Sequence, residues 1–229
     1  MKAASTQSAI ARPESLDGEE RLKSIVAERE RSQRERSGRI SFIARGGSGD
    51  ITFLWLSPLQ STDETLTLMT RLPELKRLKT GCSITPEGVA RLSALRKLTE
   101  LELRGVSLTE PFAQAICKIE GLEVLRINQS DVMEEGLAAL SRLPRLRVLD
   151  LQGNRELNDR LFVGIAPMAA VEELDVSHNE ELTDVSLAAI SRFPKLKLLH
   201  VLQSGITPPG IERTLRPGIS VSGLKSGQD

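Results

Sequence analysis

A repeating α/β protein, in which a short strand and a helix alternate about seven times, is the fold class that this sequence predicts. Two observations support it. The pattern LxxLxL recurs with a period of 23 to 25 residues, and each copy is followed by apolar residues at a different, helix-like spacing. The copies begin at Ile51, Leu75, Leu98, Leu122, Leu146, Val171 and Leu196.

Each copy of LxxLxL predicts a strand with one buried face. Side chains alternate between the two faces of a strand, so the fourth and sixth positions of the pattern point to the same side. The copies read ITFLWL, LKRLKT, LTELEL, LEVLRI, LRVLDL, VEELDV and LKLLHV. Only Thr80 places a polar residue at one of the apolar positions.

A helix of about three turns is expected after each strand. An apolar anchor follows the strand, and further apolar residues come five, eight and eleven positions later, which lie on one helical face. Leu187, Ile190 and Phe193 show this spacing behind the anchor Leu182. Hydroxyl or amide side chains stand just after the anchors, where a helix needs an N-cap. These are Thr85, Thr109, Asn158, Thr183 and Thr207.

The repeated turn resembles that of the leucine-rich repeat family, over about residues 51–221. The pattern N-x-x-LTDxxLxxI, carried by residues 179–190, is similar to the helical-backed subclasses, ribonuclease-inhibitor-like and cysteine-containing-like. The resemblance implies an arc: a leucine-rich-repeat solenoid of about seven repeats, with a concave parallel β-sheet and convex helices.

The remaining segments divide the chain further. We expect a disordered N-terminus over 1–15, a charged helix and N-terminal cap over 16–50, repeats with a C-terminal cap over 51–221, and a disordered tail over 222–229. The charged helix, within 16–37, either caps the first repeat or binds a partner. A strand at 39–44 should form a hairpin with the first repeat, and residues 219–222 should form a closing strand.

Composition excludes several classes of partner. Lys+Arg 31 and Asp+Glu 31 balance, so no overall field draws the chain to nucleic acid or to an anionic membrane. No apolar run reaches the roughly 18 residues of a membrane span, and two cysteines make a poor disulfide framework. We therefore expect a cytoplasmic protein, with a transit peptide around Lys2 and Arg12 as the alternative.

If the leucines point inward, the third, fifth and seventh positions of each repeat face the concave surface and stack into ladders. Large aromatic residues and unbalanced charges there are the candidates for binding a partner. The candidate residues are Phe53, Trp55, Arg77, Lys79, Glu102, Arg126, Asp150, Glu173, Asp175 and His200.

These candidates fall into two groups. Phe53 and Trp55 stand beside basic residues at one end, whereas Asp150, Glu173 and Asp175 form an acidic cluster with no basic neighbour, beside His200. Two alternatives remain open at this point. The charged pairs can simply keep the sheet soluble, and the N-terminal segment can fold over the two aromatic rings.

No motif for catalysis, a metal or a cofactor is present. The two histidines and two cysteines lack the spacing of a nucleophile or ligand site, and the Gly46–Gly49 run is not followed by a phosphate-binding helix. The sequence therefore predicts a non-catalytic module that binds a protein partner. The alternatives are an adaptor or effector linked to ubiquitin transfer, like the repeat arm of F-box proteins but without an F-box, and a structural subunit tethered by the charged helix.

Overall fold

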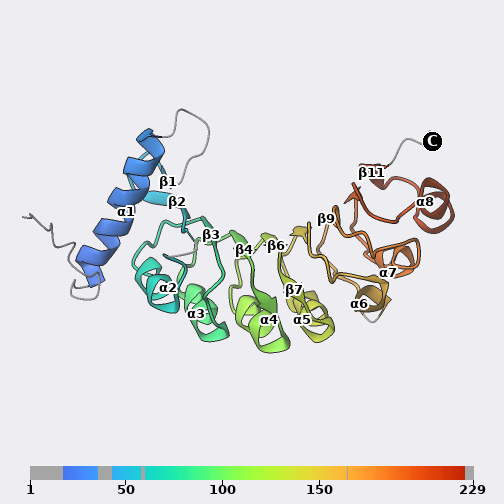
Figure 1. Cartoon of the computed structure of the whole chain (residues 1–229), viewed down its shortest axis with the longest axis horizontal. Coiled ribbons are helices and arrows are strands. Elements are labelled where there is room, and N and C mark those ends of the chain that lie inside the picture. The colour runs from blue at the N-terminus through green and yellow to red at the C-terminus, as the bar shows by residue number, and fades with distance from the viewer. Residues whose placement is uncertain (1–17, 36–42, 58–59, 164, 225–229) are drawn as a thin grey trace, which may run out of the picture.

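The computed structural model describes residues 18–35, 43–57, 60–163 and 165–224. The elements form an arc, with the strands along its inner side and the helices along its outer side (Figure 1). The predicted α/β solenoid is therefore confirmed. Within the described part of the chain, every helix is too short or too polar to cross a membrane.

Nine strands make one sheet, in the order β1-β2-β3-β4-β6-β8-β9-β10-β11. Each of the seven LxxLxL patterns provides one strand, and these seven are parallel to one another. They are β2 (Ile51–Trp55), β3 (Arg77–Gly81), β4 (Glu100–Arg104), β6 (Val124–Asn128), β8 (Val148–Asp150), β9 (Glu173–Asp175) and β10 (Leu198–His200).

Two further strands close the ends of the sheet. β1 (Ile43–Arg45) pairs antiparallel with β2, which confirms the hairpin, although residues 39–42 of the predicted strand lie outside the described residues. β11 (Ser220–Ser222) pairs parallel with β10, which confirms the predicted closing strand at residues 219–222. Both segments with predicted disorder, 1–15 and most of 222–229, also lie outside the described residues.

The helices are shorter than the three turns that the spacing predicts. They are α2 (Asp63–Met69), α3 (Pro86–Arg91), α4 (Glu110–Cys117), α5 (Glu134–Ala139), α6 (Asp159–Val163), α7 (Leu187–Ile190) and α8 (Pro208–Thr214). In two repeats, 3₁₀ turns at Leu92–Ala94 and Leu140–Arg142 continue the helix. A 3₁₀ turn is tighter than an α-helix, so the late apolar residues still reach the core while the chain turns back early.

A small second sheet was not anticipated by the sequence. β5 (Ser107–Leu108) and β7 (Asp131–Val132) pair in parallel at the apolar anchors of two neighbouring repeats. Two residues per strand are too few for a period-2 pattern to reveal.

The core is a continuous stack of the pattern's apolar side chains. The central leucines Leu101, Leu125, Leu149 and Leu174 are at most 1% exposed. The polar exception, Thr80, is also buried, and its hydroxyl group lies 3.1 Å from the Oγ atom of Ser61. Ser61 stands where the other repeats have an apolar anchor, so the two polar residues in the core satisfy each other.

Threonine caps connect successive repeats. The Thr85 side chain caps α3 by accepting a hydrogen bond from the Gly88 amide, and Thr207 caps α8 in the same way. The carboxylate of Asp63 in the preceding repeat accepts hydrogen bonds from the Thr85 amide (2.8 Å) and hydroxyl (2.6 Å). Thr109 also precedes its helix, but its side chain makes no capping hydrogen bond.

The charged segment forms helix α1 (Gly18–Glu35), which packs on the first repeat. Ile25 is buried in the common core, and Arg21 forms an ion pair with Glu64. The Gln60 amide donates a hydrogen bond to Glu28 over 2.7 Å. These contacts are those of a cap on the first repeat.

Candidate partner-binding surface

The parallel register places the candidate residues in two ladders across the sheet. Phe53 pairs with Arg77, Arg77 with Glu100, and the row continues through the third strand position to Glu173 and Leu198. The fifth position of the LxxLxL pattern makes a second row, which consists of Trp55, Lys79, Glu102, Arg126, Asp150, Asp175 and His200. Both rows have the register that the sequence predicts.

At the N-terminal end of the ladders, cations stack on the aromatic rings. The Arg77 guanidinium lies 5.1 Å from the centre of the Phe53 ring, and the Lys79 ammonium lies 4.6 Å from that of Trp55. Lys79 also forms an ion pair with Glu102 over 2.6 Å. Both aromatic side chains are only half-buried, so each presents a ring whose position is fixed by a neighbour.

Arg126 lies at the middle of the face and connects its two ends. Its guanidinium is 3.6 Å from Glu100 and 3.8 Å from Asp150, each measured between the nearest nitrogen and oxygen atoms. The expectation that the acidic cluster, beside His200, has no basic neighbour is therefore wrong. Arg126 and Asp150 are neighbours in the fifth-position row, but the sequence alone does not decide which of the nearby carboxylates the guanidinium contacts.

Asp150 is largely enclosed, with a side chain that is 18% exposed. Burial raises its pKa above the ordinary value of 3.8, and the nearby charge of Asp175 raises it further. Hydrogen bonds from the Gln152 amide (2.9 Å) and the Asn128 side chain (3.0 Å) oppose this shift, as does the charge of Arg126.

The other two acids of the cluster have different surroundings. Glu173 lies 3.4 Å from Nε2 of His200, whose Nδ1 is 2.6 Å from the Ser222 hydroxyl group in the closing strand. Asp175 accepts a hydrogen bond from the Ser177 amide over 2.8 Å. Among the described residues, Asp175 is the member of this cluster that has no ion pair.

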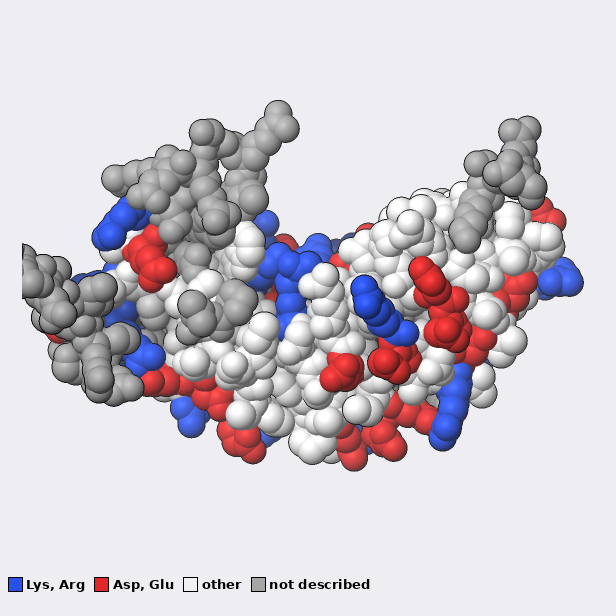
Figure 2. Space-filling model, in the orientation of Figure 1, with Lys and Arg blue, Asp and Glu red and all other residues white. Residues whose placement is uncertain are grey.

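The surface view shows how charges gather. Lys and Arg side chains form a patch near the middle of the inner rim of the arc, and Asp and Glu side chains are more frequent along the lower edge and over the C-terminal repeats (Figure 2). The separation is partial, because Lys79 and Arg126 are each held by carboxylates.

The described residues hold no group of three or more histidine, cysteine or acidic side chains that could bind a metal ion. Cys82 is exposed and Cys117 half-buried, and both are free thiols. Burial raises the pKa of Cys117, which keeps its thiol protonated and unreactive.

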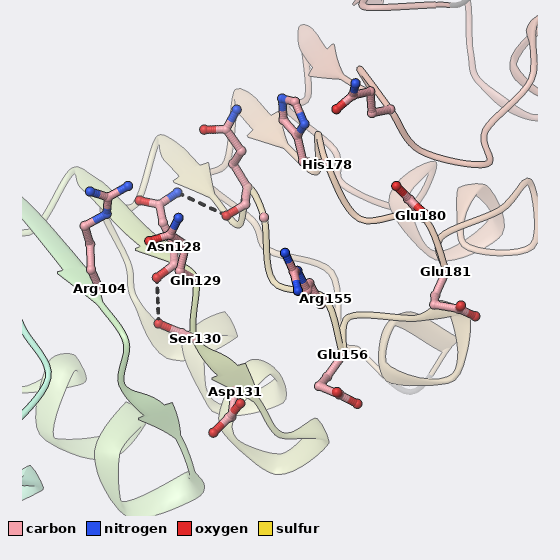
Figure 3. A pocket seen from close by; sticks show the side chains of 13 residues that line it. Arg104, Asn128, Gln129, Ser130, Asp131, Arg155, Glu156, His178, Glu180 and Glu181 are labelled. Atoms are coloured by element: carbon pink, nitrogen blue, oxygen red, sulfur yellow. Dashed lines mark hydrogen bonds between the residues drawn. The ribbon is translucent and has the colours of Figure 1, made fainter.

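The structure also brings together polar residues that the sequence analysis did not select. Gln129, Gln152, Arg155, His178 and Gln203 line a groove of about 1000 Å³ beside the ladders (Figure 3). All five lie in the turns after the strands, and only Gln152, at the seventh position of its repeat, belongs to one of the ladders. The available signal was the eighth residue of each repeat, which in the last five repeats is Gly105, Gln129, Gly153, His178 and Gln203.

Residues 171–191, which contain β9 and α7, match the Leucine Rich repeat family model. The other LxxLxL patterns pair in register with this repeat in a single sheet. Residues 171–191 are a leucine-rich repeat. No curated protein matches the sequence.

Two solved structures similar to this chain are distant in sequence. The crystal structure of the TLR13–ssRNA13 complex matches at 16% identity and a TM-score of 0.44, covering 76% of this chain and 25% of that one. A plant ice-binding protein matches at 16% identity and a TM-score of 0.49, covering 91% and 77%. The repeat protein thus spans about a quarter of the length of the first structure.

Proposed function

We propose that this repeat protein is a cytoplasmic interaction module that binds a protein partner through the concave face of its sheet. The observation that supports the proposal is the composition of that face: two half-buried aromatic rings at one end and an acid without an ion pair, Asp175, at the other. The proposal needs no cofactor and assigns no catalytic step.

The contacts on this face favour recognition. The ring of Trp55 is held by Lys79, and Lys79 is held by Glu102, so little side-chain freedom is lost when a partner binds. Aromatic residues in such positions commonly dominate the binding energy. A cation of the partner can pair with Asp175 without breaking an ion pair inside the sheet, whereas pairing with Asp150 would compete with Arg126.

The contacts of α1 bear on the structural-subunit alternative. Ile25 and the Arg21–Glu64 ion pair attach this helix to the first repeat, which supports a cap rather than a free tether. The adaptor linked to ubiquitin transfer is a more specific form of the same proposal, in which the bound partner is a target protein.

The test is capture of a partner from a lysate of the source cells, followed by titration of that purified partner. We expect wild type to retain a protein that the Trp55→Ala/Asp175→Arg variant loses. In titrations each single substitution should weaken binding by about tenfold or more, which corresponds to about 1.4 kcal/mol or more.

A convex-side variant controls for the change of charge. Glu120→Arg alters an exposed residue beyond the end of α4 and should leave the dissociation constant within about twofold of wild type. Thermal unfolding of all variants verifies that they are folded. A partner that the double variant and wild type bind equally would rule out the concave face as the binding site.

A further inference from the structure

A second surface, distinct from the concave ladders, lies in the turns that follow the strands. The groove of about 1000 Å³ runs across the repeats that contain β6, β8, β9 and β10, with Arg104 of β4 at one end and Gln203 at the other. In the close-up, Arg155 lies between His178 above and Glu156 below, and Arg104 and Gln129 lie to the left (Figure 3).

The groove contains hydrogen-bonding groups that nothing within the described residues satisfies. The side chains of Gln129, Gln152, Arg155, His178 and Gln203 make no hydrogen bond or ion pair with another described residue. Each glutamine offers two N–H donors and a carbonyl acceptor, and the arginine offers five donors. On the concave face, by contrast, most charged side chains are already paired.

The charges of the lining decide which ligand these groups suit. Carboxylates outnumber guanidinium groups: Asp131, Glu156, Glu180 and Glu181 against Arg104 and Arg155. A negative surface repels a phosphate backbone. The lining also has no phenylalanine, tyrosine or tryptophan on which a nucleobase could stack. A cationic ligand with amide groups satisfies both the carboxylates and the glutamines.

We propose that this groove binds an extended peptide segment that carries lysine or arginine side chains. The glutamine amides pair with the C=O and N–H groups of its backbone, and the Glu180 and Glu181 carboxylates pair with its basic side chains. Gln129 and Gln203 belong to repeats three strand spacings apart, which is about 14 Å at the spacing of paired strands. About four extended residues cover that length.

The backbone conformation allows two glutamine amides of the groove to be removed without straining the fold. Gln129 and Gln203 have positive φ angles of 50° and 54°, which glycine adopts with less strain than glutamine. Glycine already occupies the same repeat position at Gly105 and Gly153. The Gln129→Gly/Gln203→Gly variant therefore removes both side-chain amides and should keep the wild-type fold.

The experiment uses the full chain and a random seven-residue peptide phage library. We expect the selected peptides to be rich in lysine and arginine. A fluorescein-labelled copy of one selected peptide is then titrated by fluorescence anisotropy. Its dissociation constant should rise by about tenfold or more in Gln129→Gly/Gln203→Gly and in Glu180→Lys/Glu181→Lys.

Two controls keep this test separate from that of the concave face. Glu120→Lys/Glu135→Lys makes the same change of net charge on exposed residues outside this groove and should leave binding within about twofold of wild type. The Trp55→Ala/Asp175→Arg variant should also bind the peptide normally. A loss of peptide binding in that variant would overturn the groove assignment.

Three further results would overturn the proposal. One is a selection with no excess of basic residues, or no selected peptide at all. Another is binding that the groove variants leave unchanged. The third is that a labelled twelve-nucleotide oligouridylate binds to wild type and is lost in the groove variants, which would make the groove a site for RNA.

Discussion

The eighth residue of six repeats adopts a left-handed backbone conformation, although only two of the six are glycine. The positions are Cys82, Gly105, Gln129, Gly153, His178 and Gln203. A non-glycine residue there costs about 1–2 kcal/mol. Backbone hydrogen bonds to the next repeat offset this cost, as in the bonds from the Cys82 amide to Arg104 (2.8 Å) and from the His178 amide to Leu202 (2.6 Å).

Asp150 gives a prediction for the pH dependence of stability. Its pKa is raised above 3.8 mainly by burial, so its ionised form destabilises the folded state at neutral pH. As the pH falls through the raised pKa toward 3.8, this penalty disappears. We expect Asp150→Asn to be at least as stable as wild type at pH 7, and wild type to gain stability relative to the variant as the solution is acidified.

Urea unfolding of both proteins at a series of pH values between 7 and about 3.5 measures this difference. Asp131→Asn removes a carboxylate at an exposed position and serves as a control for the effect of losing one negative charge. The prediction is wrong if wild type loses stability relative to Asp150→Asn on acidification. That result would mean that the ion pair with Arg126 outweighs the burial of the carboxylate.

At the scale of elements, the repeats are joined by the contact of a glycine with a side chain of the preceding repeat. A Cβ atom on Gly88 would overlap the carboxylate of Asp63, and one on Gly210 would overlap that of Asp184. Those carboxylates hold the Thr85 and Thr207 caps of the following helices. Each glycine therefore makes room for the group that begins its own helix.

Gly88→Ala should lower the free energy of unfolding by about 1–2 kcal/mol, because displacing Asp63 weakens the cap of α3. This loss should occur although alanine favours a helix over glycine by about 1 kcal/mol. Asp63→Ala should cause a similar loss. The double variant should lose little more than Asp63→Ala alone, because the overlap no longer exists.

A double-mutant cycle by chemical denaturation measures the coupling, which we expect to be about 1 kcal/mol. Gly136→Ala serves as a comparison, since its Cβ would overlap the backbone carbonyl of Leu108, which no side-chain removal can relieve. Strict additivity of Gly88→Ala and Asp63→Ala would contradict the proposed contact.

The whole molecule is a stack in which each repeat packs on its neighbours, so its ends need covers. α1 and β1 cover the first repeat, and β11 covers the sheet edge of the last. Arg216, which follows α8, donates hydrogen bonds to the backbone carbonyls of Ser191, Phe193, Pro194 and Leu196. This one side chain satisfies carbonyls at the end of the preceding helix and in the turn after it.

Arg216→Ala should destabilise the C-terminal end by about 1–3 kcal/mol, because it leaves partly buried carbonyls without donors. Arg216→Lys should recover only part of the loss, since an ammonium group lacks the planar fork of a guanidinium. Hydrogen exchange followed by mass spectrometry should show faster exchange in residues 191–222 and unchanged exchange in residues 98–151. An equal increase throughout would show that the repeats open together, against the expectation for a stack.

The periodic sequence by itself determined the number of repeats, the strand register, the two ladders and the hairpin and closing strand at the ends. These features follow from local rules, because identical patterns of period 2 stack with equivalent residues side by side. The buried leucines and two of the threonine caps, Thr85 and Thr207, could be predicted for the same reason.

Only the tertiary structure decided the features that depend on the reach of a side chain or on the path of a turn. Arg126 pairs with Asp150 across strands, and Thr80 and Ser61 satisfy each other in the core. The groove forms where turns from several repeats come together, and the helices end early where the chain must return to the sheet. These contacts join residues about 20 or more positions apart, and no local pattern specifies their side-chain conformations.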